Sequence, residues 1–123
     1  MKVGFFGDGP WSHKAFNLLI EDKNFDVVFV CVRNDPGDEH LIKLAKKENI
    51  EVLQNENINS PHFISKLKLY DSDIFVSLAF NQIFKKDAIQ LPLRGVINCH
   101  AGKLPRYRGR NILNWALIND ERE

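Results

Sequence analysis

Phe25-Asp26-Val27-Val28-Phe29-Val30-Cys31-Val32 is the stretch that decides the fold. From Val27 onward the side chains on both faces of this expected strand are apolar. Strands of that composition lie inside parallel sheets that carry helices on both faces. The rest of the chain repeats the pattern, because short apolar runs alternate with segments of helical periodicity. We therefore expect an α/β fold with a doubly wound, mostly parallel, Rossmann-like sheet.

The expected strands and helices alternate along the whole chain. Strands are expected at residues 2–6, 25–32, 51–53, 73–78 and 95–98, and helices at 11–20, 38–48, 61–69, within 80–90, and at 111–119. Ser60 and Pro61 mark one helix start, since serine favours the N-cap and proline suits the first helical position. The apolar face of the first helix is expected to hold Trp11, Ala15, Leu18 and Leu19.

Size and composition restrict the class of protein. With 123 residues, 44% hydrophobic and 27% charged, the chain can form one globular domain with one core. No apolar run approaches the roughly 20 residues of a membrane helix, and the N-terminus lacks the features of a signal peptide. Cys31 and Cys99 are expected to be core residues of strands rather than a disulfide or a metal pair. These features predict a cytoplasmic protein without membrane attachment.

Positive charge is concentrated late in the chain. The formal net charge is only +1, yet residues 94–119 hold no acidic residue and five basic ones: Arg94, Lys103, Arg106, Arg108 and Arg110. Arginine binds phosphate and carboxylate groups through paired hydrogen bonds, so this segment points to an anionic ligand. The alternative is a solvated loop with scattered positive charges.

Three expected loops leave the carboxyl ends of strands: residues 7–10, 79–82 and 100–110. Ligands of open parallel sheets bind at these ends, so the loops are expected to border one crevice. The first loop matches a dinucleotide fingerprint poorly, because His13 replaces the third glycine and Arg33 and Asn34 stand where an acidic residue is expected. It is either a tight strand-to-helix turn or a ligand-contacting loop. Trp11 is either a wedge in the core, which we favour, or a stacking platform beside the site.

The strongest chemical signal lies at the end of the last expected strand. Asn98 and His100 are two residues apart, so their side chains are expected to share one face while Cys99 points away. An amide that stabilises an oxyanion and an imidazole that moves a proton suit acyl transfer. The alternative is a structural His100 bonded to the backbone. The other histidines (His13, His40 and His62) are expected on helix surfaces, and no spacing of His and Cys matches a metal site.

The residues after this pair carry a family resemblance. Asn98-x-His100 followed by Leu104-Pro105-x-Tyr107-Arg108-Gly109 resembles the signature of the formyltransferases that use N10-formyltetrahydrofolate. With residues 7–11 and 98–111 included, the chain is most similar to the sugar N-formyltransferases. The resemblance implies transfer of a formyl group from N10-formyltetrahydrofolate to the primary amine of a dTDP-linked amino-dideoxy sugar, for lipopolysaccharide O-antigen or other surface polysaccharide biosynthesis.

The resemblance also implies how far the chain reaches and which residues act. It covers residues 1–123 but only the N-terminal Rossmann-like part of the family's catalytic domain. The family's catalytic set is an asparagine, a histidine and an aspartate, of which the first two correspond to Asn98 and His100. The aspartate lies on a later loop, so this chain alone is expected to lack it, and Asp120 is too close to His100 to replace it. Any homodimer is expected to form through regions outside this chain.

The binding residues are implied by the resemblance too. The folate site takes backbone from the segment after the fourth strand, which gives the cofactor-binding candidates Phe80, Asn81, Gln82 and Ile83. Phe80 and Ile83 either line an apolar slot or belong to the core. The candidates for binding the sugar nucleotide are Gly9, Trp11, Lys103, Tyr107, Arg108 and Arg110, with Tyr107 and Arg108 preferred.

Two further functions stay open at this point. The first is methionyl-tRNA formyltransferase. The nearly neutral charge counts against it, since tRNA-binding proteins usually carry a broad basic surface, and nucleic acid is therefore not the expected partner. The second is a non-catalytic nucleotide-binding domain or an inactive remnant, in which Asn98 and His100 have no special role.

Overall fold

Five strands form the central sheet of the computed structural model, which describes residues 1–109 and 111–121. They are β1 (Lys2–Gly7), β2 (Asp26–Val32), β3 (Val52–Leu53), β4 (Ile74–Leu78) and β5 (Val96–Cys99). Their spatial order is β3-β2-β1-β4-β5, and every neighbouring pair is parallel. The predicted doubly wound parallel sheet is confirmed.

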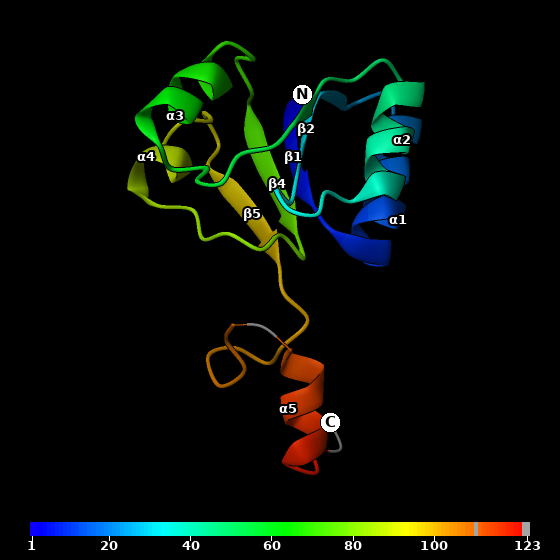
Figure 1. The fold of residues 1–123 in the computed structure, drawn as a ribbon, viewed down its shortest axis with the longest axis vertical. Coiled ribbons are helices and arrows are strands. Elements are labelled where there is room, and N and C mark those ends of the chain that lie inside the picture. The colour runs from blue at the N-terminus through cyan, green and yellow to red at the C-terminus, as the bar shows by residue number, and fades with distance from the viewer. Residues whose placement is uncertain (110, 122–123) are drawn as a thin grey trace.

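The helices are α1 (Gly9–Glu21), α2 (Glu39–Lys47), α3 (Pro61–Lys68), α4 (Lys86–Ile89) and α5 (Ile112–Ile118). Figure 1 shows α1 and α2 on one face of the sheet and α3 and α4 on the other, with α5 beyond the carboxyl end of β5. Ser60 caps α3 as predicted, because its side chain accepts a hydrogen bond from the Phe63 N–H. Within the described ranges, no helix is long and apolar enough to cross a membrane.

The alternation of side chains along β1 divides the core into two layers. Phe5 packs against Phe16 of α1, with ring centroids 5.8 Å apart. Phe6 points to the opposite face, where it packs against Phe29 and Phe75 beneath α3. Because both faces of the sheet are covered, the central strands need apolar residues at consecutive positions, as the sequence from Val27 to Val32 has.

Three predictions of burial are wrong. Trp11 is 73% exposed, because the face of α1 that meets the core contains Ser12 and Phe16, one position later than predicted. The same offset leaves Leu18 exposed. Cys99 is exposed because β5 lies at an edge of the described sheet and pairs with β4 on one side. Cys31, in contrast, is fully buried in β2 as predicted.

Candidate active site

The carboxyl ends of three adjacent strands border the candidate site. From β1 the chain continues to β2 on one side, whereas β4 lies on the other side of β1, so the sheet has its switch point between β1 and β4. Doubly wound sheets bind ligands at such a point. The Asp8 N–H donates to the Leu78 carbonyl oxygen at 3.3 Å, so the loops that leave β1 and β4 are in contact there. The neighbouring β5 brings Asn98 to the same carboxyl end of the sheet.

Asn98 lies in β5 opposite Ser77 of β4, and Ser77 lies opposite Phe6 of β1. Residues paired across strands point to the same face, so Asn98 points to the face that Phe6 shares with α3. The residue is exposed, which leaves its amide accessible to a ligand. Its catalytic role stays a prediction, now with a geometry that allows it.

The His100 ring is held by the loop that follows β5. Its Nε2 atom makes a short contact with the Tyr107 carbonyl oxygen. A carbonyl only accepts hydrogen bonds, so Nε2 must carry the proton in this contact. Nδ1 is then the nitrogen with a lone pair for a further proton. The backbone contact expected of a structural His100 is therefore present, and it is compatible with a base at Nδ1.

Gly102 makes this contact possible. A Cβ at this position would overlap the Tyr107 carbonyl and would lie 3.0 Å from the His100 Nε2. A side chain at residue 102 would therefore push the Tyr107 carbonyl away from the ring. Glycine is therefore favoured at position 102 for a steric reason. The sequence alone did not show this reason, because the close approach depends on how the loop folds back on itself.

The described basic residues after β5 lie in solvent. Lys103, Arg106 and Arg108 are exposed, and Arg110 lies outside the described residues. The Arg106 guanidinium is 4.0 Å from a Glu121 carboxylate oxygen with 77% of its side chain exposed, a type of ion pair that contributes little. Lys103, Arg106 and Arg108 are therefore accessible to an anionic ligand, and their exposure fits the alternative of a solvated loop equally well.

Tyr107 is engaged with the end of α5. Its hydroxyl donates to Glu121 Oε1 at 2.9 Å and accepts from the Asn119 amide at 3.2 Å. Through these two bonds the loop after β5 is attached to the segment after α5. The aromatic side chain predicted to contact the substrate is thus oriented by the protein itself.

The segment predicted to bind the folate follows β4 directly. The Gln82 amide bridges to a neighbouring loop, accepting from the Ile58 N–H at 2.9 Å and donating to the Asn55 carbonyl at 2.8 Å. The Phe80 ring packs against Phe6, with centroids 5.5 Å apart, whereas Ile83 is 84% exposed. Asn81 is exposed as well. The Gln82 and Phe80 side chains therefore hold the segment in place, and the Ile83 carbonyl accepts from the Asn59 amide at 2.9 Å. The exposed side chains of Asn81 and Ile83 are left to meet a ligand.

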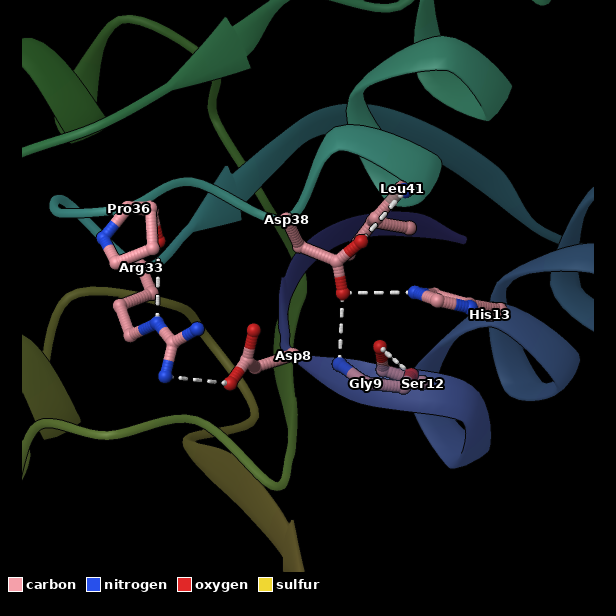
Figure 2. A network of polar contacts seen from close by, with 8 residues as sticks. All are labelled: Asp8, Gly9, Ser12, His13, Arg33, Pro36, Asp38 and Leu41. Carbon is pink, nitrogen blue, oxygen red and sulfur yellow. Dashed lines mark hydrogen bonds and ion pairs between the residues drawn. The ribbon is translucent and has the colours of Figure 1, made fainter.

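A polar network fixes the loop after β1 (Figure 2). The Asp38 carboxylate accepts hydrogen bonds from the Gly9 N–H at 2.7 Å, from His13 Nε2 at 2.7 Å and from the Leu41 N–H at 2.9 Å. It therefore caps α2 and also binds the first residue of α1. The prediction of a surface His13 is wrong: only 19% of its side chain is exposed, because it faces Asp38 and stacks on the exposed His40. His62 is exposed as predicted.

The environment keeps Asp38 ionised. Its partial burial acts to raise the pKa, but the hydrogen bonds from Leu41, Gly9 and His13 outweigh burial and hold the pKa of the carboxyl below its ordinary value of 3.8. A carboxylate of the protein thus occupies the N-terminus of α1, where dinucleotide-binding folds place a phosphate. This arrangement explains physically why the sequence after β1 departs from the dinucleotide fingerprint.

Arg33 and Asp38 were not predicted as site residues. The Arg33 guanidinium lies 3.4 Å from an Asp8 carboxylate oxygen, and its Nε donates to the Pro36 carbonyl at 3.1 Å. An aspartate at an N-cap, three residues before Leu41, was the available sequence signal for Asp38. Within residues 1–109 and 111–121, no cluster of three or more His, Cys, Asp and Glu residues could bind a metal.

Fold and site together define a Rossmann-like α/β protein with an asparagine and a histidine at the carboxyl edge of its sheet. Comparison with protein families makes the assignment specific, because the profile described as Formyl transferase matches residues 1–123. The chain belongs to the formyl transferase family. The predicted resemblance is thereby confirmed at the level of the formyl transferase family, but not for the sugar N-formyltransferases.

The methionyl-tRNA formyltransferases that match this chain are about two and a half times as long. The methionyl-tRNA formyltransferase of Geobacter metallireducens is 39% identical over 131 residues, which is 100% of this chain and 42% of that protein. The methionyl-tRNA formyltransferase of Clostridium acetobutylicum is 37% identical, over 98% of this chain and 41% of its own length. The chain thus spans about two fifths of the length of these relatives.

Solved structures confirm the fold. The phosphoribosylglycinamide formyltransferase of Bacillus halodurans superposes with a TM-score of 0.79 over 98% of this chain and 66% of its own, at 15% sequence identity. Glycinamide ribonucleotide transformylase 1 of Geobacillus kaustophilus gives a TM-score of 0.75 at the same identity, over 96% of this chain and 67% of its own. At this identity the likeness concerns the architecture alone.

The comparisons correct the expected acceptor. Relatives that match the whole chain are named methionyl-tRNA formyltransferase, which contradicts the expected dTDP-amino sugar and its place in polysaccharide synthesis. It also contradicts the expectation that nucleic acid is not a partner. The physical reason is that the roles expected of Asn98 and His100 concern a carbonyl oxygen and a proton, which are the same for any amine acceptor, so their motif does not specify the acceptor. The net charge of +1, which counted against tRNA, is that of a chain about two fifths as long as these relatives.

Proposed function

We propose that this chain is the formyl-transferring part of a protein that formylates methionyl-tRNA, with N10-formyltetrahydrofolate as the donor. The observation that supports the proposal is an exposed Asn98 and an oriented His100 at the carboxyl edge, in a chain that matches methionyl-tRNA formyltransferases along its whole length. The reaction joins a formyl carbon to the primary amine of the esterified methionine and releases it from the donor.

The segment after β4 fits the donor. A pterin ring is flat and carries hydrogen-bonding edges, which backbone groups of residues 80–83 could satisfy. The structure holds this segment firmly through the two Gln82 bonds and leaves the Ile83 side chain 84% exposed beside it. When bound, the folate would supply an activated formyl group.

The roles of Asn98 and His100 follow from charge. The formyl oxygen gains negative charge as an amine attacks, and the Asn98 amide would donate a hydrogen bond to it, worth about 3–4 kcal/mol of barrier in comparable sites. The amine must lose a proton, and His100 would accept it at Nδ1, since Nε2 donates to the Tyr107 carbonyl.

The cations after β5 suit a nucleic-acid acceptor. Lys103 and Arg108 are exposed in the loop that follows the catalytic pair. The amine of an aminoacyl-tRNA lies next to the terminal nucleotide, so phosphates would come close to this loop. Contacts of Lys and Arg with phosphates would position the acceptor and make its affinity fall with salt.

The test is an acceptor assay with the full-length protein. Methionyl-tRNA, uncharged tRNA and free methionine are each incubated with protein and N10-formyltetrahydrofolate, and products are identified by mass. The proposal predicts formylmethionine on methionyl-tRNA alone, with the activity lost in Asn98→Ala. Formylation of free methionine at an equal rate, or no product in any reaction, would contradict it. Folate binding without turnover would favour the non-catalytic domain.

A further inference from the structure

The connection between β2 and α2 holds the loop after β1 at two points. At one end of this connection, residues 33–38, the Arg33 guanidinium lies 3.4 Å from the Asp8 carboxylate. At the other end the Asp38 carboxylate accepts from the Gly9 N–H at 2.7 Å. Figure 2 shows both contacts reaching the same short loop from the same connection. Residues 8 and 9 are therefore positioned by a segment more than twenty residues later.

The 33–38 segment is itself well supported. The Gln54 amide, just after β3, donates to the Arg33 and Asn34 carbonyls at 3.1 Å and 3.2 Å. A Cβ at Gly37 would lie 2.5 Å from the same amide nitrogen, so the segment closely approaches Gln54. Asp38 is fixed from its other side because it caps α2. A support of this kind can transmit the geometry of the sheet to the loop it holds.

The loop held in this way borders the candidate site. Asp8 donates its N–H to Leu78 at the end of β4, and Leu78 lies opposite Cys99, the residue between Asn98 and His100. Trp11, two residues after Gly9, is 73% exposed on the first turn of α1. A shift of Gly9 would therefore move an exposed aromatic surface relative to the catalytic pair.

We propose that Asp38 is a positioning residue that sets the loop of residues 8–11 for acceptor binding, with Arg33 as its second support. The inference rests on the proposed function only for the choice of acceptor. Asp38 acts through the Gly9 N–H and His13 and itself lies under the surface, with 8% of its side chain exposed. Its loss should therefore weaken acceptor binding rather than slow the chemical step.

Asp38→Asn is the selective variant. Asparagine is as good an N-cap as aspartate, so its oxygen can still accept from the Leu41 N–H and keep α2 capped. Its NH2 group would then face the Gly9 N–H, and two donors cannot bond each other. The matched control is Asp35→Asn, the same change of charge on an exposed residue of the same segment.

Two measurements on the full-length protein test the inference. Hydrogen exchange should accelerate in the peptide of residues 7–12 in Asp38→Asn and stay unchanged in Asp35→Asn. With methionyl-tRNA varied, the KM should rise about tenfold in Asp38→Asn while kcat and the KM for the donor stay within twofold. Unchanged exchange, or a fall in kcat at constant acceptor KM, would overturn the inference.

Arg33→Gln is a second variant, which leaves the Asp38 contacts with Gly9 and Leu41 intact. It removes the ion pair with Asp8 and should raise the acceptor KM by a smaller factor, about threefold, with faster exchange in the same peptide. An acceptor KM and an exchange rate equal to wild type would overturn the role of the segment, even if Asp38→Asn failed to fold. Absence of turnover in the wild type would contradict the proposed function, and the exchange experiment would still decide this inference.

Discussion

The loops after β1 and after β5 both border the candidate site, but different parts of the chain hold them. The loop after β1 is bonded to residues 25, 29 and 70 positions further along the chain, in the Asp8–Arg33, Gly9–Asp38 and Asp8–Leu78 contacts. The loop after β5 is held by contacts 7 to 14 positions apart, from His100 to Tyr107 and from Tyr107 to Glu121. The first loop belongs to the framework of the sheet, and the second is organised by its own neighbourhood.

The difference separates two tasks. A loop fixed by the framework suits the binding of a ligand in a constant position. A loop fixed by local contacts sets the tautomer of one side chain, His100, without depending on the core. Variants in the two loops should therefore affect stability and chemistry to different degrees.

The largest effect is expected at Asn98. Asn98→Ala in the full-length protein should lower kcat by about 100- to 1,000-fold, because it removes the donor to the charged formyl oxygen. The residue is exposed, so the melting temperature should stay at the wild-type value. Steady-state kinetics and thermal unfolding check both parts. A loss of less than threefold would show that the amide does not act on the reacting carbonyl.

Variants at Asp38 and Tyr107 compare how much the contacts of each loop contribute to stability. Asp38→Ala should lower the free energy of unfolding by about 2–4 kcal/mol, since it removes an N-cap and leaves the Gly9 and Leu41 N–H groups unpaired. Tyr107→Phe removes the hydroxyl contacts of the other loop and should cost less than about 1 kcal/mol. Urea unfolding of both variants makes the comparison. Equal losses would mean that the framework does not distinguish the two loops.

Gly102 tests the local contact. Gly102→Ala should displace the Tyr107 carbonyl from His100 and lower kcat by about tenfold, because the imidazole tautomer is no longer set. Gly109→Ala offers a control in the same loop, since no atom lies within 4 Å of a Cβ there, although its φ of +89° adds backbone strain. The two variants are compared at equal folded fraction. The contact has no catalytic role if both lower kcat equally.

The smallest effect concerns pH. The pKa of Asp38 lies below its ordinary 3.8 in the folded protein, so ionisation of this carboxyl stabilises the fold above that pH. The contribution disappears as the pH falls through the lower folded-state pKa. The melting temperature of the wild type should therefore fall more steeply than that of Asp38→Asn below about pH 4. Parallel curves for the two proteins would show that the folded state does not favour the carboxylate.

Local signals sufficed for most of the fold. Apolar residues on both faces of the stretch from Val27 to Val32 predicted a buried parallel strand, and Ser60 with Pro61 predicted the start of α3. The burial of Trp11 was predicted wrongly because a shift of one residue rotates a helix face by 100°, which moves the stripe from Trp11 to Ser12. The burial of Cys99 depends on whether its strand has neighbours on both sides. No local sequence pattern shows this.

The positions of the candidate site residues were predictable where they depend on the local sequence. Asn98 and His100 stand two residues apart, so their position at the sheet edge followed from the pattern of strands. The contact of Asp38 with Gly9 joins residues 29 positions apart, and the overlap at Gly102 requires the closed loop. The acceptor was predicted wrongly because the roles expected of Asn98 and His100 concern the formyl group and not the molecule that receives it.

The most direct test of the account is the rate of formyl transfer to methionyl-tRNA by the full-length wild type and by His100→Asn, measured with the donor in excess. We expect formylation by the wild type and a rate at least about 100-fold lower in the variant, with unchanged hydrogen exchange in β1 and β4. Comparable rates in the two proteins would contradict the central claim that the carboxyl edge of this sheet carries the chemistry.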